Sequence, residues 1–260
     1  MKVGFVGAGN VATHIAKALF DKGHDIAYVT SANGSSAIAL SKQFNGRALK
    51  SASAFPADLD LIIIATTDSA IENVAGELPK SDAIVAHTSG STSLHSLISA
   101  GHTRCAVIYP FQTFTKDSAI DFSQVPFFLE CDSTETYNKI YDVFKEISPY
   151  VYEANSEVRR QIHVAGVFSS NFIVYIIELA RRILSKADLP LDVVKHLVMT
   201  SVEKSFASNT PLEVLTGPAR RGDIDIIQEH LQTLNEHEGK EIYKVISESI
   251  LSEFKNKNVR

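Results

Sequence analysis

A short apolar run at the start of the chain leads directly into a glycine-rich segment and then into a helical pattern. Residues Lys2–Val6 form the apolar run, Gly7-Ala8-Gly9-Asn10-Val11-Ala12 follow it, and residues 10–22 have helical periodicity. In this GxGxxA pattern Gly7 permits a tight turn, Gly9 lets a pyrophosphate approach the backbone, and Ala12 allows close packing of helix on strand. The helix N-terminus adds free N–H groups that favour phosphate. The segment predicts a dinucleotide-binding loop; the alternative is a glycine-rich turn that binds nothing.

Strand and helix patterns alternate over the rest of the first half, which is typical of a parallel α/β sheet. After residue 156 the sequence has helical patterns without a convincing strand, at residues 156–187, at 191–207 and from Asp223 towards Phe254. We therefore predict an α/β fold in which residues 1–154 form a Rossmann-type, mostly parallel sheet. Residues 155–260 are predicted to form an all-helical domain for substrate binding and dimerisation. The expected strands are residues 2–6, 25–30, 48–49, 60–65, 83–87, 104–109, 127–130 and 151–153.

Charge and cysteine content exclude several classes of function. The net charge is -5 and the isoelectric point is near 6.0, whereas a nucleic-acid-binding surface needs a basic face. The two cysteines, Cys105 and Cys131, lack zinc-ligand spacing, and no HxxxH or HxH motif occurs, so we expect no metal site. Few cysteines also favour a reducing, cytoplasmic location over a disulfide framework.

The most apolar window, residues 162–180, contains His163, Asn171 and Glu178. These polar side chains predict a buried helix rather than a membrane span. One small helical layer offers too little surface to cover a helix that is apolar on nearly all sides. We therefore expect a homodimer built on the helical domain, with no nucleic-acid or membrane partner.

The region after the second expected strand predicts which dinucleotide binds. NAD-specific Rossmann domains place an acidic residue about 20 residues beyond the glycine loop, where it accepts the ribose hydroxyls. No Asp or Glu occurs between Ile26 and Asn45, and Thr30, Ser31 and Asn33 can donate hydrogen bonds to a 2′-phosphate. The sequence thus predicts NADP(H), with NAD(H) as the weaker ligand. The alternatives are a pocket that tolerates both cofactors and an adenosine pocket that has decayed.

Three further segments carry a resemblance to a known family: His87-Thr88-Ser89-Gly90-Ser91, residues 163–172 and residues 215–223. Together with the glycine loop, they resemble bacterial proteins classed as NADP oxidoreductases, in which a Rossmann-like domain precedes a helical domain of unknown function. The layout is also similar to pyrroline-5-carboxylate reductases and deazaflavin-dependent NADP reductases, and more distantly to 3-hydroxyisobutyrate-type dehydrogenases. The resemblance implies a reaction class and assembly through helical domains, but no particular substrate.

Two positions depart from the patterns of these relatives. Hydroxyacid dehydrogenases carry a catalytic lysine one helical turn before an asparagine; if that asparagine matches Asn171, Val167 occupies the lysine position. Alcohol oxidation by that lysine mechanism is therefore not expected. Tyr109-Pro110 stands where many relatives have His-Pro.

Ligands of open α/β sheets lie beyond the carboxyl ends of the strands, which selects candidate residues independently of any motif. Proton donors near a nicotinamide could be His87, Tyr109 or His163. Each has a structural alternative: His87 can hold the following loop, and Tyr109 can pack its ring in the core. On a regular helix His163 and Ser170 share a face with Asn171 beside them, so they either face a cleft or form a buried polar cluster.

We predict an NADP-dependent oxidoreductase that transfers a hydride to a C=N or C=O group of a small metabolite at the interdomain cleft. The alternative is a non-catalytic dinucleotide sensor or dimeric scaffold. The expected catalytic residues are His163, Asn171, Ser170, His87 and Tyr109. The expected cofactor-binding residues are Gly7, Gly9, Asn10, Val11, Ala12, Thr30, Ser31, Asn33, Thr66, Thr67 and Thr88. Gln112, Arg220 and Arg221 are expected to bind substrate, the arginines as a fork for a carboxylate or phosphate or, alternatively, as surface ion-pair partners.

Overall fold

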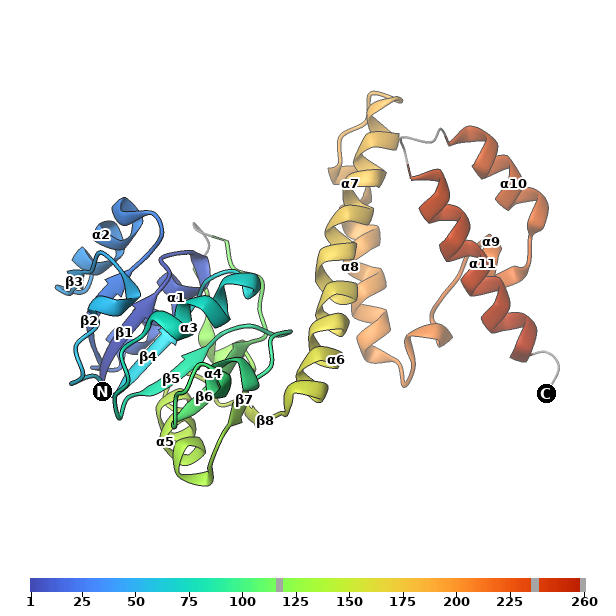
Figure 1. Cartoon of the computed structure of the whole chain (residues 1–260). Coiled ribbons are helices and arrows are strands. Elements are labelled where there is room, and N and C mark those ends of the chain that lie inside the picture. Colours follow the sequence, from blue (N-terminus) through green and yellow to red (C-terminus); the bar gives the residue numbers. More distant parts are fainter. Residues whose placement is uncertain (116–118, 235–238, 258–260) are drawn as a thin grey trace. The chain divides into compact units, whose positions relative to one another are not determined.

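A single eight-stranded sheet organises the first part of the chain in the computed structural model, which describes residues 1–115, 119–234 and 239–257 (Figure 1). The strand order is β3-β2-β1-β4-β5-β6-β7-β8, and every neighbouring pair is parallel except β6 and β7. The first six strands follow the doubly wound order of a Rossmann fold. From β1 the chain adds strands first on one side, to β3, and then on the other side, starting with β4. The strands are β1 (Lys2–Val6), β2 (Asp25–Thr30), β3 (Arg47–Ala48), β4 (Leu61–Ile64), β5 (Ile84–His87), β6 (Cys105–Pro110), β7 (Phe127–Cys131) and β8 (Val151–Glu153).

Helices pack on both faces of this sheet and give it two hydrophobic cores. The core on one face contains apolar residues of α1 (Asn10–Asp21), α2 (Gly34–Lys42) and α5 (Thr134–Lys145). The core on the other face contains residues of α3 (Ile71–Glu77) and α4 (His95–Ser99). Strand β4 shows why its sequence is continuously apolar: Leu61 and Ile63 enter the first core, whereas Ile62 and Ile64 enter the second.

The remainder of the described chain is helical. Its helices are α6 (Ser156–Gly166), α7 (Phe172–Ser185), α8 (Asp192–Ala207), α9 (Pro218–Arg221), α10 (Ile224–Thr233) and α11 (Lys240–Lys257). A π-helical segment, Val167–Asn171, joins α6 to α7 without a break. Short 3₁₀ turns lie at Ala52–Ala54, Asp68–Ala70, Phe122–Gln124 and Pro211–Glu213.

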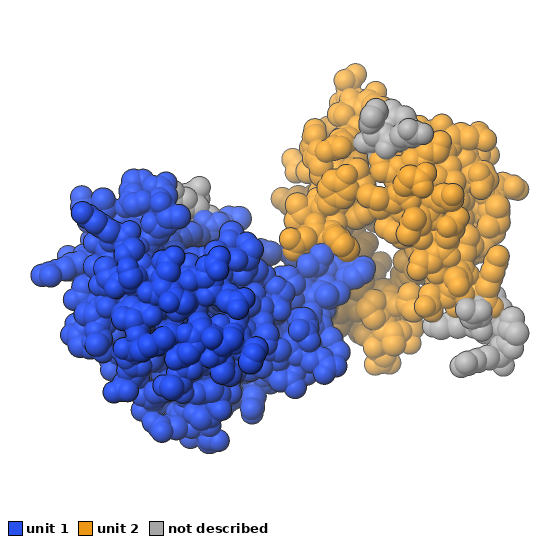
Figure 2. All heavy atoms as spheres, viewed as in Figure 1, with its two compact units in different colours: residues 1–170 blue, residues 171–260 orange. Residues whose placement is uncertain are grey.

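Two compact units emerge from the packing, the sheet unit (Met1–Ser170) and the helical unit (Asn171–Arg260) (Figure 2). The predicted fold class, a mostly parallel Rossmann-type sheet followed by helices, is confirmed. The predicted domain boundary near residue 154 coincides with the end of the last strand. The packing division falls later because α6 makes its contacts with the sheet unit.

The expectation that residues 162–180 form a buried helix is wrong for the single chain. Only 6% of the most apolar window of the helix Ser156–Ser185 is buried, and Leu179 is the buried residue of α7. By length and composition this helix could cross a membrane, which is weak evidence because core helices of soluble proteins meet the same criterion. The apolar surface of α7 is therefore uncovered within one copy of the chain.

Candidate active site

The glycine loop between β1 and α1 has the geometry of a phosphate cradle. Gly7 has a φ of 112°, and a Cβ atom there would lie 2.2 Å from the carbonyl oxygen of Ala65, so only glycine fits. Gly9 is different: its φ of -82° suits any residue, and a Cβ atom would meet nothing within 4 Å. The fold therefore requires Gly7, whereas the open space at Gly9 suits close approach of a ligand.

The first turn of α1 fits an anion in the same way. No side chain caps this helix and its first turn contains no acidic residue, so backbone N–H groups are available to a pyrophosphate. Ala12 is fully buried and lets α1 lie close to the sheet, while Val11 packs against the same core. These residues fit a dinucleotide, and they would hold its phosphates mainly through the backbone.

The loop after β6 is attached to this first turn. The Asn10 side-chain amide donates a hydrogen bond of 2.9 Å to the carbonyl of Phe114. One turn later, Nε2 of His14 lies 2.9 Å from the carbonyl of Thr115. The Asn10 side chain thus has a partner in the protein, so its predicted contact with the cofactor would come through its backbone.

The end of β2, where the adenosine ribose is expected, carries no acidic side chain. Thr30 is buried and its carbonyl accepts the N–H of Gly7 at 2.7 Å. The Asn33 side chain caps α2 by accepting the N–H of Ser35 at 3.1 Å. Ser31 lies between them in the sequence and is partly exposed, so it remains a candidate ligand for a 2′-phosphate.

His87, predicted as a possible proton donor, holds the loop that follows β5. Its Nδ1 accepts the N–H of Ser89 at 3.2 Å, and its Nε2 lies 3.4 Å from the carbonyl of Ser93. The ring is fully buried, and burial, followed by the positive charge of Arg159, lowers its pKa from 6.5 to about 4. The imidazole is therefore neutral at physiological pH and occupied at both nitrogens, which fits the structural alternative.

The same loop lies next to polar groups from the end of β4. Thr66 and Thr67 follow that strand, and the N–H of Thr88 bonds the carbonyl of Ile64 at 3.2 Å. Asp68 accepts a hydrogen bond from the hydroxyl of Ser91. The carboxyl ends of β4 and β5 thus form one polar edge, as the strand order predicts.

Tyr109 and His163 form a hydrogen-bonded pair at the end of β6. The Tyr109 hydroxyl lies 3.0 Å from Nδ1 of His163, although the two residues are 54 positions apart. A Cβ atom at Gly90 would lie 2.7 Å from both His163 Nδ1 and Tyr109 Cζ, so the backbone at Gly90 lies directly against the pair. Burial raises the pKa of the Tyr109 phenol, partly offset by the charge of Arg159. Tyr109 therefore stays protonated at neutral pH and can act as a proton donor.

Among the described residues, the structure shows no hydrogen bond of Ser170, Asn171 or Gln112 with the Tyr109–His163 pair. Ser170 and Asn171 lie in the π-helical segment, where i→i+5 bonding changes the angular spacing on which the predicted His163–Ser170 face depended. Gln112 is exposed and accepts the N–H of Thr113 at 2.8 Å.

The two arginines predicted to bind substrate lie in the helical unit, and both have protein partners. Arg220 donates a hydrogen bond of 2.9 Å to the carbonyl of Leu215 and lies 5.3 Å from the ring centre of Phe254. Arg221 forms an ion pair with Asp223 at 2.8 Å. Arg221 thus fits the ion-pair alternative, whereas the partners of Arg220 are a backbone carbonyl and an aromatic ring.

Sequence reasoning missed Gly90 and the ion pair between Arg159 and Glu130. Gly90 lies inside the recognised segment His87–Ser91, but its close contact with Tyr109 joins segments that are distant in sequence. Arg159 occurs next to Arg160 in an ordinary helical pattern, so no local signal marks it as buried. In the described part of the chain no group of three or more His, Cys, Asp or Glu side chains is arranged to hold a metal ion.

Comparisons with known proteins agree with this geometry. The family described as "NADP oxidoreductase coenzyme F420-dependent" matches residues 2–89, and a domain of unknown function, DUF2520, matches residues 125–250. No curated protein matches the sequence.

Solved structures extend the comparison over the whole chain. A structure described as a putative NADP oxidoreductase from Bacteroides fragilis is 32% identical, with a TM-score of 0.88 and coverage of 96% of this chain and 98% of that one. A 1-pyrroline-5-carboxylate reductase from Streptococcus pyogenes has 16% identity, a TM-score of 0.67 and coverage of 97% and 98%. A reductive aminase from Aspergillus terreus, in complex with NADPH and ethyl-5-oxohexanoate, has 16% identity, a TM-score of 0.64 and coverage of 89% and 77%.

The last two likenesses concern the fold alone. The first is strong enough in identity and coverage to show a family. This chain belongs to the family of NADP oxidoreductases in which a Rossmann-type sheet domain precedes the helical domain of unknown function.

Proposed function

We propose that this protein uses NADPH to reduce a C=N or C=O group of a small metabolite, with Tyr109 and His163 supplying the proton. The observation that carries the proposal is the 3.0 Å hydrogen bond between these two side chains at the carboxyl edge of the sheet. Ligands of open α/β sheets bind at this edge, and the phosphate cradle at Gly9 lies on the same sheet. The structural relatives with reductase and NADPH in their descriptions support the reaction class.

In this proposal the cofactor supplies a hydride when bound, and the chain supplies the proton. The Tyr109 hydroxyl donates its proton to the nitrogen or oxygen of the reduced group. His163 is only partly buried, so its Nδ1 can pass a replacement proton from solvent to the tyrosine oxygen. Val167, one helical turn before Asn171, has no group that can donate a proton, which favours this tyrosine–histidine pair over a lysine donor at that place.

We propose further that NADP(H) binds in preference to NAD(H). The end of β2 lacks the carboxylate that would hold two ribose hydroxyls and repel a 2′-phosphate. The hydroxyl of Ser31 and the N–H groups at the start of α2 favour the phosphorylated ribose.

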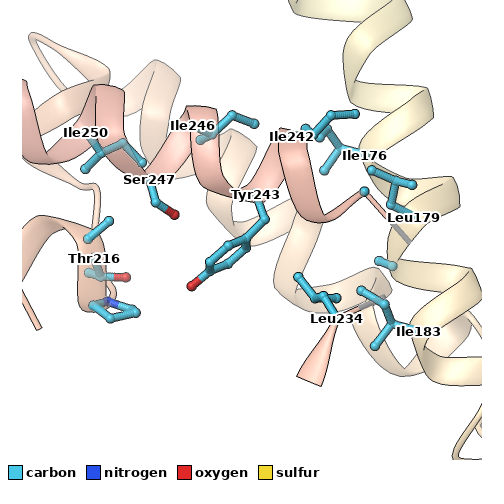
Figure 3. Close-up of a pocket in the computed structure, with 14 residues that line it drawn as sticks. Ile176, Leu179, Ile183, Thr216, Leu234, Ile242, Tyr243, Ile246, Ser247 and Ile250 are labelled. Atoms are coloured by element: carbon cyan, nitrogen blue, oxygen red, sulfur yellow. The ribbon is translucent and has the colours of Figure 1, made fainter. Parts of the chain in front are cut away.

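The apolar surface of the helical unit supports a homodimer as the working form. Val174 of α7 is 68% exposed, and Leu197 of α8 is 66% exposed. Between α7 and α11 lies an open, mostly apolar cavity of about 370 Å³, whose lining includes Ile176, Leu179 and Ile246 (Figure 3). Contiguous exposed apolar surface of this kind is typical of an interface. We propose that a second copy of the helical unit covers it.

The proton-donor proposal is tested by Tyr109→Phe. We expect NADPH affinity to be unchanged, because Tyr109 is not part of the phosphate cradle. Oxidation of NADPH should fall by about 10²-fold, which is the effect of removing a positioned general acid. The measurement is NADPH absorbance with a panel of small cyclic imines and ketones, and isothermal titration with NADPH alone.

Tyr150→Phe is the matched control, because Tyr150 is an exposed tyrosine in the same unit. An equal rate for Tyr109→Phe and the unmodified protein would exclude the tyrosine as donor. Tight NADPH binding without oxidation by any member of the panel would favour the alternative function, a non-catalytic dinucleotide sensor.

A further inference from the structure

One cation is buried completely beside the proposed proton-donor pair. The side chain of Arg159 is 0% exposed, and among the described residues no other Lys, Arg, Asp or Glu side chain is classed as buried. Burying a charge costs several kcal/mol before partners compensate it, and such pairs often add little net stability. A buried arginine is thus better explained by the arrangement it imposes than by stability.

The partners of Arg159 come from two segments outside its own helix. Its guanidinium forms an ion pair with Glu130 of β7 and donates a hydrogen bond to the carbonyl of Thr92 in the loop after β5. Ser156, one turn before Arg159 on α6, lies 2.7 Å from the same Glu130 carboxylate. These contacts fix the first turn of α6 against both the loop and the strand.

His163 lies four residues after Arg159, one turn further along the same face of α6. Phe128, two residues before Glu130 on β7, is paired with Tyr109 in the sheet register. The Thr92 loop also contains Gly90, whose backbone lies against both members of the pair. Arg159 is therefore bonded to the segments that carry or contact Tyr109, and it sits on the helix that carries His163.

We propose that Arg159, paired with Glu130, is a positioning residue that holds His163 within hydrogen-bond distance of Tyr109. A shift of about 1 Å would break that hydrogen bond, because a donor–acceptor distance of about 4 Å lies outside the hydrogen-bonding range. The inference rests on the proposed function only for its catalytic meaning, because the geometry itself can be tested without a substrate. The charge of Arg159 also favours the phenolate that remains after Tyr109 has donated its proton.

The test replaces both partners, Glu130→Met with Arg159→Met, so that no buried charge is left unpaired. Apolar replacement of a whole buried pair is often neutral for stability. The readout is the ¹⁵N chemical shift of the His163 ring in the full-length protein. We expect the double variant to shift this signal to its position in Tyr109→Phe, where the hydrogen bond is absent.

Glu135→Gln with Lys139→Gln is the matched control, because it removes the exposed ion pairs of Glu135 with Lys139 and Arg104 from the same unit. It should leave the His163 signal unchanged. The dissociation constant of NADPH should stay within about twofold of the unmodified protein in both variants. A His163 signal in the Met variant identical to that of the unmodified protein would overturn the proposal.

If the double variant does not fold, Glu130→Gln tests the positioning role of Arg159 instead. This substitution keeps the shape of the side chain but removes its charge, and we expect a smaller shift of the His163 signal in the same direction. An unchanged signal in a folded Glu130→Gln protein contradicts the positioning role. Because these spectra need no turnover, an inactive Met variant with an unmoved His163 signal rejects Arg159 alone, whereas full activity of Tyr109→Phe rejects the proposed proton donor alone.

Discussion

The sheet unit and the helical unit differ in how completely each buries its own apolar residues. Strands β1, β4, β5 and β6 are almost wholly inaccessible to solvent, and helices cover both faces of the sheet. In the described part of the helical unit, the buried apolar residues are Leu179, Ala219 and Ile227. Helix α8 has no buried residue along its whole length.

This difference indicates that the two units obtain their stability in different ways. The sheet unit has its own hydrophobic cores on both faces of the sheet, as compact domains do. The helical unit exposes side chains such as Phe206, at 87%, that folded domains normally cover. A second copy of the chain is the occupant we propose, which makes the stability of the helical unit dependent on protein concentration.

Val174→Glu tests whether the helical unit depends on a second copy, and of the predictions here it should have the largest effect. On an exposed face of a monomer the substitution would change stability by less than about 0.5 kcal/mol. Within a dimer interface it buries an unpaired charge, and we expect dimer affinity to fall by about 10³-fold, equivalent to about 4 kcal/mol. Light scattering at micromolar concentration measures the change from dimer to monomer.

Ile38→Glu provides the control for Val174→Glu. Ile38 is an exposed apolar residue of a helix in the sheet unit, at 48%, and its replacement should leave the dimer intact. An unmodified protein that is monomeric at micromolar concentration would show that the helical unit is stable despite its exposed apolar surface.

Gly9→Asp tests whether the glycine loop of the sheet unit binds the cofactor. A Cβ atom at Gly9 meets nothing, and aspartate is a favoured residue at the helix N-cap, so the fold should survive. The carboxylate would repel the pyrophosphate, and we expect NADPH affinity to fall by about 10²-fold or more. Calorimetric titration measures the loss. Gly76→Asp, on an exposed glycine of α3 with equally open surroundings, should bind NADPH normally.

The comparison also explains which features the sequence could predict. The strands and the glycine loop can be recognised from local sequence. Strand β4 is apolar at every position, and Gly7 and Gly9 come just after the end of β1. The Tyr109–His163 pair was named residue by residue, but its contact depends on packing between segments 54 positions apart. The apolarity of residues 162–180 already indicated that one helical layer cannot cover them, but the sequence does not identify the covering partner, because an apolar helix has the same pattern whatever covers it.

The role of His87 is a second feature that the sequence alone could not decide. A histidine at the end of a strand is equally compatible with catalysis and with holding a loop. Only its complete burial and its two backbone partners distinguish the roles. The π-helical segment likewise has no signal in the periodicity of residues 156–187, so the predicted face of Ser170 and Asn171 assumed a regular helix.

His87→Asn sharpens the contrast by separating a structural histidine from a catalytic one. The folded-state pKa of His87 is about 4, below its ordinary 6.5, so between these values the unfolded chain binds a proton that the folded chain does not. Folding stability from this group is therefore fully present above pH 6.5 and falls by about 3 kcal/mol as the pH drops to 4. Denaturant unfolding at pH 7 and pH 4.5 should show a smaller loss in His87→Asn. Equal losses in both proteins would contradict the buried neutral imidazole.

Ser31→Asp should produce the smallest effect, because it alters one contact at the ribose while leaving the phosphate cradle intact. The new carboxylate at the end of β2 would accept the ribose hydroxyls of NADH and repel the 2′-phosphate of NADPH. We expect the unmodified protein to prefer NADPH by about tenfold, which corresponds to about 1.4 kcal/mol. The preference is modest because no arginine follows β2 directly: Lys42 is at the end of α2 and Arg47 begins β3.

Dissociation constants for both cofactors must be measured at one ionic strength, because salt weakens contacts to phosphate. Thr30→Asp is a poor alternative for this test, since Thr30 is buried and the substitution would disturb the sheet. Tighter binding of NADH than of NADPH by the unmodified protein would overturn the assignment of this pocket, and with it the inference that a missing carboxylate selects the phosphorylated cofactor.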